Sequence, residues 1–264
     1  MSFSFSFRLD FMSLIPILFF FFAAHCFKFM RFFLVLLEER ELSFFGILFL
    51  YVRTTFVNLV IPFKLGELYR VAAVRHMTGS FKTGVSFVVI DRFFDTLSLI
   101  LITLPFEIFF MKSADPVLTL LLCSLIILFL CYLFYYPSFR YLNRFIIRQK
   151  SSKRALALLE FLDRTKEWYL FLRKLIRGRG PLVIMASLLG WGMEIAALRI
   201  FFLSFGTDFE IGSFISYINS ILSGGAGAIS RSYNLFGSVI FLTLTVTLFI
   251  INGSKGKSIR SALP

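Results

Sequence analysis

Long runs of apolar residues are the feature that most constrains the fold of this chain. An α-helix needs about 20 apolar residues to cross a hydrocarbon core of about 30 Å, and several runs reach that length. Hydrophobic residues make up 58% of the 264 residues, including 38 Phe, and only 16% are charged. A soluble domain is typically about 45–50% apolar. The chain is therefore predicted to be an all-α, polytopic helical membrane protein, and a soluble enzyme is excluded.

The apolar runs divide the chain into candidate spans. About six transmembrane helices are expected, over residues 11–37, 43–61, 84–111, 117–136, 181–205 and 235–251. Residues 64–82 are too polar to cross, and residues 211–222 are only marginally long enough. Both segments are expected to form re-entrant or interfacial half-helices. Because no internal repeat is evident, residues 1–264 are predicted to form a single integral membrane domain.

Basic residues gather between the apolar runs. The chain has 28 Lys and Arg against 15 Asp and Glu, a net charge of +13. Cytoplasmic loops carry such an excess, so residues 64–82, residues 140–179 and the C-terminal tail are expected in the cytoplasm. The acidic residues 38–41 and the loop with Asp208 and Glu210 are expected outside. Six crossings of a cell membrane then place both termini in the cytoplasm, and anionic lipid rather than nucleic acid is the expected partner.

Residues 138–180 are predicted to be a basic amphipathic cytoplasmic segment. Between Arg140 and Arg179 there are twelve Lys and Arg residues against three acidic ones. Apolar residues recur there at helical spacing, at Leu158, Phe161, Leu162, Tyr169, Leu172 and Ile176. This spacing is typical of a helix that lies on the membrane surface.

Charged residues inside the expected spans are candidates for a functional site. A charge at the centre of a membrane helix costs at least about 2.5–3.5 kcal/mol, so such residues usually face a partner or a watery cavity. Asp91 and Asp95 share a helix face, and Arg92 can pair with Asp95. Further charges within spans are Arg53, Glu107, Glu194 and Arg199. Two interpretations stay open: a polar cavity for a charged headgroup, or ion pairs that only hold the bundle together.

The segment from Asn58 to Arg70 is a second candidate. Pro62 interrupts the helix, Gly66 follows, and Glu67 and Arg70 are three residues apart. Transport proteins place such breaks at their substrate sites, where free backbone groups and helix ends meet charged ligands. An ordinary cytoplasmic loop is the alternative.

These two segments resemble one known family. Arg53, Asn58, Pro62, Lys64, Gly66, Glu67 and Arg70, followed by Ser86, Asp91, Arg92 and Asp95, are similar to the pattern of the lysylphosphatidylglycerol synthase transmembrane-region family, also called flippase-like domain proteins. The resemblance covers residues 27–95 well and residues 181–206 loosely. Residues 223–231 depart from the Pro- and Gly-rich motif with an acidic partner that the family pattern leads us to expect.

The resemblance implies a role in moving anionic or polyprenyl-linked lipids across the bilayer. Family members fused to a soluble aminoacyltransferase domain make and translocate lysyl-phosphatidylglycerol. This chain of 264 residues is expected to have no such domain and therefore no synthase activity.

Three functions remain as hypotheses: a lipid flippase or transporter, a membrane-embedded lipid-modifying enzyme, and a non-catalytic partner subunit. For the first, the lipid phosphate of an anionic phospholipid or a polyprenyl-phosphate lipid would be attracted by arginines. The expected headgroup site consists of Arg53, Asn58, Pro62, Gly66, Glu67, Arg70, Asp91, Arg92 and Asp95. No catalytic residue, metal ligand or cofactor is predicted, because no recognisable motif for one is present.

Overall fold

The structure is a computed structural model that describes residues 11–37, 42–61, 65–106, 116–148, 153–223 and 228–260. Within these ranges every regular element is an α-helix. The helices are α1 (Phe11–Leu36), α2 (Phe44–Val60), α3 (Gly66–Thr78), α4 (Phe81–Phe106), α5 (Pro116–Arg148), α6 (Lys153–Ile176), α7 (Gly180–Ser204), α8 (Ile211–Ser223) and α9 (Ala228–Arg260).

The predicted class, a polytopic helical membrane protein, is confirmed. Four helical segments are long and apolar enough to cross a membrane: Met12–Leu36, Leu118–Arg148, Gly180–Ser204 and Ile229–Ile251. They belong to α1, α5, α7 and α9. Of the other two expected spans, α2 has only 17 residues, and α4 has 26 residues but contains Asp91, Arg92 and Asp95.

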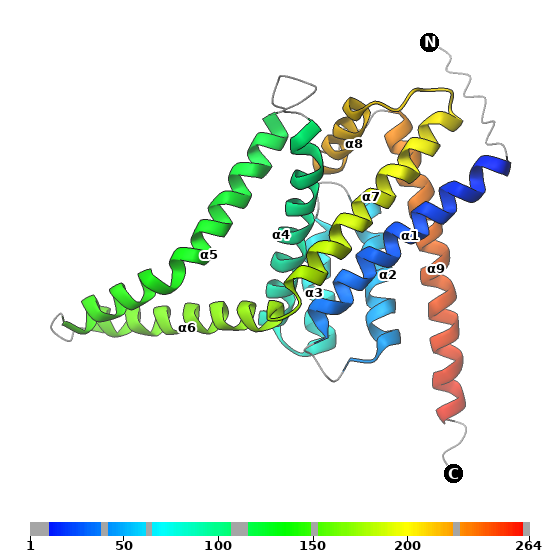
Figure 1. Ribbon diagram of the computed structural model, residues 1–264. Helices are drawn as coiled ribbons and strands as arrows, with labels where there is room; N and C mark the ends of the chain where they lie inside the picture. The colour runs from blue at the N-terminus through cyan, green and yellow to red at the C-terminus, as the bar shows by residue number, and fades with distance from the viewer. Residues whose placement is uncertain are drawn as a thin grey trace.

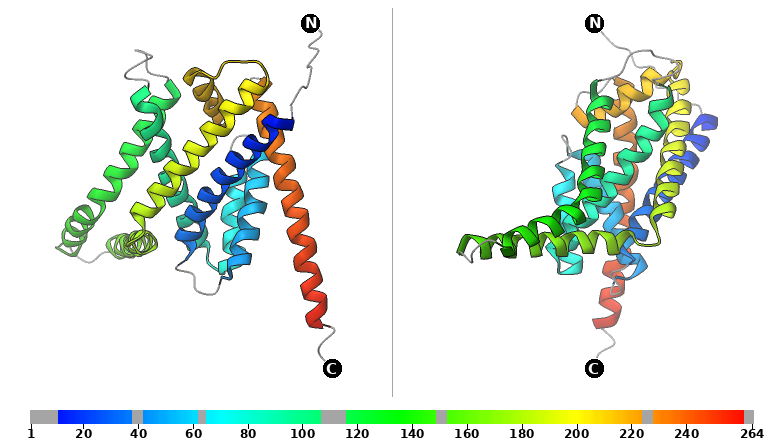
Figure 2. Two further views of the ribbon diagram at one scale, coloured as in Figure 1. Left: turned by 45° about the vertical axis from the view of Figure 1, so that its right-hand side comes forward. Right: turned by 60° about the vertical axis from the view of Figure 1, so that its left-hand side comes forward.

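The bundle is built around α1 and α7, which lie side by side (Figure 1). α3 packs against α4, and α2 packs against both α3 and α9. α5 leans away from the bundle, and α6 lies across one end of it (Figures 1 and 2). The helix predicted from the spacing of residues 158–176 is confirmed, since these residues lie in α6. α5 continues to Arg148 and so includes the first part of the basic segment.

α2 and α3 form a hairpin that turns back inside the bundle. Ser43 caps the start of α2 by accepting a hydrogen bond from the backbone N–H of Gly46 at 3.1 Å. Gly79 caps the end of α3, and its φ of 69° favours glycine. Between these ends, Asn58 of α2 donates a hydrogen bond to Glu67 of α3, and Arg70 of α3 contacts Asp91 near the middle of α4. Residues 64–82 were expected to form a half-helix, and α3 is that half-helix, directed inward.

The hairpin returns to the end of the bundle from which it starts. α1 ends, α2 begins and α3 ends at the same end of the bundle as α6 (Figure 1). The hairpin of α2 and α3 therefore starts and finishes at one end of the bundle. The first turn of α1 and the last turn of α9 lie at opposite ends of the bundle (Figures 1 and 2).

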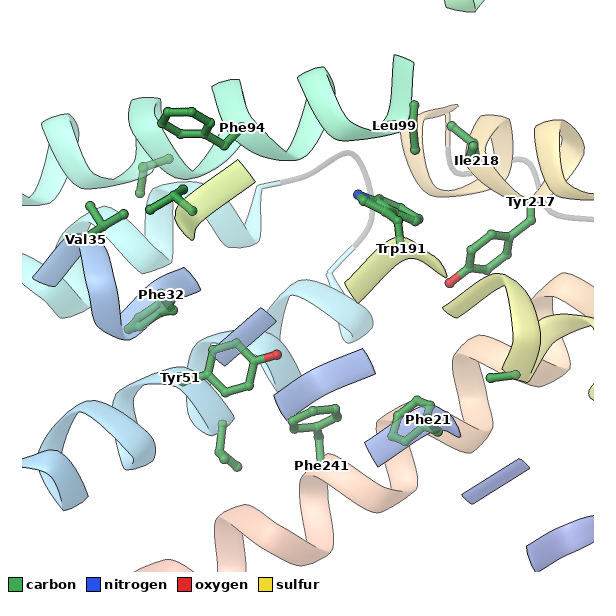
Figure 3. Close-up of a cluster of buried hydrophobic side chains, with 14 of the residues drawn as sticks. Phe21, Phe32, Val35, Tyr51, Phe94, Leu99, Trp191, Tyr217, Ile218 and Phe241 are labelled. Atoms are coloured by element: carbon green, nitrogen blue, oxygen red, sulfur yellow. The ribbon is translucent and has the colours of Figure 1, made fainter. Parts of the chain in front are cut away.

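Aromatic side chains from different helices form much of the core. Phe32 of α1 packs edge-to-face on Phe87 of α4, with ring centroids 4.5 Å apart. Figure 3 shows side chains from α1, α2, α7, α8 and α9 gathered around one region, among them Phe21, Tyr51, Trp191, Tyr217 and Phe241. Edge-to-face contacts of this kind fix ring positions better than aliphatic packing does. The aromatic core therefore holds these helices in place around the cavity described next.

Candidate functional site

A cavity of about 560 Å³ lies inside the bundle and is lined by parts of α1, α2, α3, α4, α7, α8 and α9. Its charged lining residues are Lys28, Arg31, Glu67, Arg70, Asp91, Arg92, Asp95, Glu194 and Arg231. Such a density of charge inside an apolar bundle is unusual because each unpaired ion would carry a large desolvation cost.

Asp91 is the centre of the largest ion-pair network. Its side chain is 1% exposed. One carboxylate oxygen, Oδ1, lies 2.8 Å from Nε of Arg31. The other, Oδ2, accepts hydrogen bonds from Arg70 at 2.8 Å and from Arg92 at 2.7 Å. One carboxylate thus holds together guanidinium groups from three helices, α1, α3 and α4.

Asp95, one helical turn after Asp91, extends the network toward α7. Its Oδ1 accepts hydrogen bonds from Nη1 of Arg31 at 2.8 Å and from the indole N–H of Trp191 at 3.1 Å. Its Oδ2 lies 3.1 Å from Nη1 of Arg92. Arg31 also donates to Ser187 Oγ at 3.1 Å. The two aspartates and Arg31 therefore join α1, α4 and α7 through charge-assisted hydrogen bonds.

The hairpin places Glu67 and Arg70 in the same network. Glu67 lies 3.4 Å from both Arg70 and Arg92, and it accepts a hydrogen bond from Asn58 Nδ2 at 2.9 Å. Gly66 makes this approach possible. A Cβ at that position would lie 2.0 Å from Asn58 Oδ1 and 2.7 Å from Asn58 Cα. Only glycine lets the start of α3 come this close to the end of α2.

A second polar cluster lines the cavity between α1, α7 and α8. Lys28 pairs with Glu194 at 2.9 Å, and its ammonium lies 4.8 Å from the centroid of the Trp191 ring. The hydroxyl of Tyr217 donates to Glu194 at 3.2 Å. Figure 3 shows Tyr217 and Trp191 on neighbouring parts of this wall. The cluster gives the buried Glu194 carboxylate both a counter-ion and a hydrogen-bond donor.

Some polar atoms of the cavity wall have no hydrogen-bond partner within the described part of the chain. They include Oδ1 of Asn58 and the Nε atoms of Arg70 and Arg92. Buried polar groups are hydrogen-bonded in more than about 90% of cases. These atoms are themselves fully buried, so a ligand in the cavity reaches them only when the side chains turn toward it.

Most of the predicted site residues come together around this cavity. Those that line it are Asn58, Glu67, Arg70, Asp91, Arg92 and Asp95, and Gly66 supports them from the hairpin. Arg53 does not line it. Its side chain is exposed, with the guanidinium 5.3 Å from the centroid of the Tyr69 ring. Pro62 lies outside the described residues.

Helical periodicity explains the position of Arg53. Tyr51, Thr55 and Asn58 are spaced i, i+4, i+7 and all line the cavity. Arg53 is two residues from Tyr51 and two from Thr55, which places it on the opposite face of α2. The two charged residues of α7 likewise lie on different faces of their helix, because Glu194 lines the cavity and Arg199 is exposed. Glu107, the other charge noted within a span, lies outside the described residues.

Several lining residues were not among the predicted site residues: His25, Lys28, Arg31, Trp191, Glu194, Tyr217 and Arg231. Two of them could have been found from the sequence, because Lys28 and Arg31 are charged residues three apart within an apolar run. In the described ranges no three His, Cys, Asp or Glu side chains are grouped closely enough to hold a metal ion.

The family whose description is Lysylphosphatidylglycerol synthase TM region matches residues 6–232 of the 264-residue chain. No curated protein and no solved structure matches it. The matched region includes every charged residue of the cavity wall.

Proposed function

The chain belongs to the lysylphosphatidylglycerol synthase TM region family, and on this premise we propose that it is a lipid flippase or transporter. Its substrates would be anionic phospholipids or polyprenyl-phosphate lipids. The single observation that carries the proposal is a charged cavity of about 560 Å³ inside an apolar helical bundle. A lipid headgroup needs such a polar path because its charge is costly in hydrocarbon.

Arg70 and Arg92 are the residues proposed to bind the lipid phosphate. Guanidinium groups form strong, often bidentate hydrogen bonds with phosphate oxygens. Both side chains line the cavity, and that of Arg92 is 30% exposed. Asp91 and Glu67 would hold the two guanidinium groups in position before the lipid arrives. Pre-positioned donors lose less conformational entropy when a ligand binds.

The alternative of a lipid-modifying enzyme draws less support from the geometry. Its candidate acid or base was Asp91 or Asp95. Asp91 contacts three guanidinium groups, and Asp95 contacts two and an indole N–H. Neither carboxylate can reach a substrate atom unless these contacts rearrange. The partner-subunit hypothesis has no observation of its own in its favour.

The proposed orientation in the cell membrane places the end of the bundle with α6 in the cytoplasm. α6 and the last part of α5 carry the most basic stretch of the sequence, and cytoplasmic loops are the basic ones. With this orientation the C-terminal end of α9 lies inside and the start of α1 lies outside, because they lie at opposite ends of the bundle (Figure 1).

A leaflet-exchange assay tests the proposal. The purified chain is reconstituted into vesicles that contain fluorescent phosphatidylglycerol or a fluorescent polyprenyl phosphate, and exchange is measured by reduction of the outer-leaflet dye. We expect exchange faster than in protein-free vesicles. Arg70→Gln should remove most of it, whereas Arg53→Gln should not, because Arg53 lies outside the cavity. Exchange no faster than in empty vesicles for every lipid tried would refute the proposal.

A further inference from the structure

The cavity opens sideways, between the end of α2 and the beginning of α9. Of its lining residues, Val60 and Leu235 are 55% and 61% exposed, and Ile61 is 36% exposed. Arg231 of α9 is exposed as well. The charged lining residues of α1, α3, α4 and α7 are buried or half-buried. These four exposed residues define the mouth of the cavity: Val60, Ile61, Arg231 and Leu235.

The mouth combines one cation with an apolar rim. Val60, Ile61 and Leu235 present aliphatic side chains, and Arg231 presents a guanidinium group. A soluble phosphate would gain nothing from the aliphatic rim. A lipid can keep its acyl chains against this aliphatic rim and in the surrounding hydrocarbon while its phosphate lies near the arginine. The chemistry of the mouth thus fits a phosphate that carries hydrocarbon chains.

Charge balance distinguishes Arg231 from the other basic residues of the cavity. Each of the inner cations lies within 2.9 Å of a carboxylate oxygen, and these cations are Lys28, Arg31, Arg70 and Arg92. The carboxylates that neutralise them are those of Glu67, Asp91, Asp95 and Glu194. Four positive charges therefore face four negative charges. Arg231 forms no ion pair with any described residue, so among the described lining residues it is the uncompensated charge.

Arg231 also begins a polar face on the first part of α9. Asn234 and Ser238 follow at three and seven residues, which places them on the same side of α9, and both line the cavity. Arg70, which also lines the cavity, is 5% exposed, and its Nε atom lacks a hydrogen-bond partner among the described residues. A ligand that enters past Arg231 thus meets further polar groups on the inside.

We propose that Arg231 determines the headgroup charge that the cavity accepts, so that lipids with a single net negative charge are preferred over net-neutral lipids. The inference rests on the proposed function and deepens it. The phosphate of the lipid first contacts Arg231 at the mouth, with its acyl chains against Val60, Ile61 and Leu235. It then passes to Arg70 and Arg92 further inside. The balanced inner network contributes orientation, and Arg231 contributes the net attraction.

Two lipids labelled on an acyl chain test this role, because such a label leaves the headgroup charge unchanged. Exchange and equilibrium binding in detergent are measured for phosphatidylglycerol, which is anionic, and phosphatidylcholine, which is net neutral. We expect the native chain to prefer the anionic lipid. Arg231→Gln should reduce this preference about tenfold or more, the size expected for the loss of one charge-assisted hydrogen bond. Arg231→Lys should keep most of the preference because it keeps the charge.

Arg199→Gln is the matched control. It removes the same charge from an exposed arginine on α7 that does not line the cavity, and the lipid preference should not change. The two arginine-to-glutamine variants and the native chain are first compared by gel filtration. If Arg231→Gln does not fold, Arg231→Glu and Arg231→Lys provide the comparison of negative and positive charge at the same position.

The results separate this inference from the proposed function. Equal binding of the two lipids by the native chain, or an unchanged preference in Arg231→Gln, would overturn the role of Arg231. A native chain that binds the anionic lipid preferentially but exchanges neither would overturn the flippase proposal and leave the role of Arg231 standing. Soluble glycerophosphoglycerol serves as competitor. Competition as strong as that of the lipid would show that a free phosphate suffices and would overturn the role of the apolar rim.

Discussion

Replacing Asp91 by Asn tests whether one buried carboxylate holds the charge network together. The side chain keeps its shape and one carbonyl oxygen but loses its negative charge. Three guanidinium groups, those of Arg31, Arg70 and Arg92, lie within 2.8 Å of its oxygens. Without the charge, they repel one another in a buried site where only Asp95 and Glu67 remain to balance them. Removal of one partner of a buried ion pair costs about 3–5 kcal/mol.

The measurement is equilibrium unfolding in mixed micelles, followed by circular dichroism as the denaturing detergent increases. We expect Asp91→Asn to lower the free energy of unfolding by about 3–5 kcal/mol. Glu160→Gln is the control, because Glu160 pairs with Arg164 at 2.6 Å on α6 but both side chains are more than 60% exposed. Exposed pairs of this spacing contribute about 0.3–0.5 kcal/mol.

A double substitution shows whether the cost comes from uncompensated charge. Arg70→Gln removes one of the three cations, so the Asp91→Asn and Arg70→Gln changes together should cost less than the sum of the two separate costs. Additive costs, or a cost of Asp91→Asn no larger than that of Glu160→Gln, would refute the reasoning that the network depends on the charge of Asp91.

Two further predictions concern the hairpin and the orientation of the bundle. Gly66→Ala should destabilise the chain by about 1–3 kcal/mol, because its Cβ would lie 2.0 Å from Asn58 Oδ1. Gly192→Ala is the control and should not destabilise it, because no atom lies within 4 Å of its Cβ. Equal unfolding midpoints for the two variants would contradict the tight hairpin. The orientation is tested with single cysteines in a background without native cysteines. Asp163→Cys on α6 should react with an impermeant thiol reagent only after cells are opened, whereas Asp208→Cys should react in intact cells. The reverse pattern would contradict the proposed orientation.

The sequence could predict that the charged residues of α4 meet a partner, because an unpaired charge in hydrocarbon is too costly to keep. Asp91 and Asp95 are one turn apart, so a shared face followed from helical geometry alone. The break at Pro62 and Gly66 likewise indicated that Glu67 and Arg70 belong to a half-helix. In the structure these residues lie together, with Gly66 allowing α3 to approach Asn58 closely.

The depth of the α2–α3 hairpin could not be predicted in this way. The carboxylate that holds Arg70 comes from α4, 21 residues later, and sequence spacing does not show whether such a partner draws a polar segment inward or leaves it at the surface. The topological difference follows from this one point. Because α2 begins and α3 ends at the same end of the bundle, the proposed orientation has one crossing fewer than the sequence predicts, and the first turn of α1 and the last turn of α9 lie at opposite ends.

The sequence also could not predict which residues of distant helices form ion pairs. Lys28 and Glu194 are 166 residues apart, and no local pattern connects them. Arg53 shows the opposite limit. It belongs to the motif on which the family resemblance rests, yet the spacing of Tyr51, Thr55 and Asn58 places it on the outer face of α2. The motif therefore did not predict whether Arg53 lines the cavity, whereas its position on the helix relative to Tyr51, Thr55 and Asn58 did.

Photo-crosslinking tests most directly whether the charged cavity receives a lipid headgroup. An anionic phospholipid with a photoreactive group on its headgroup is added to the reconstituted chain, and the labelled peptides are mapped by mass spectrometry. We expect labels on the cavity-lining parts of α2, α3 and α9, and fewer of them in the Arg70→Gln variant. Labels confined to the outward faces of α5 and α6, unaffected by that substitution, would contradict it.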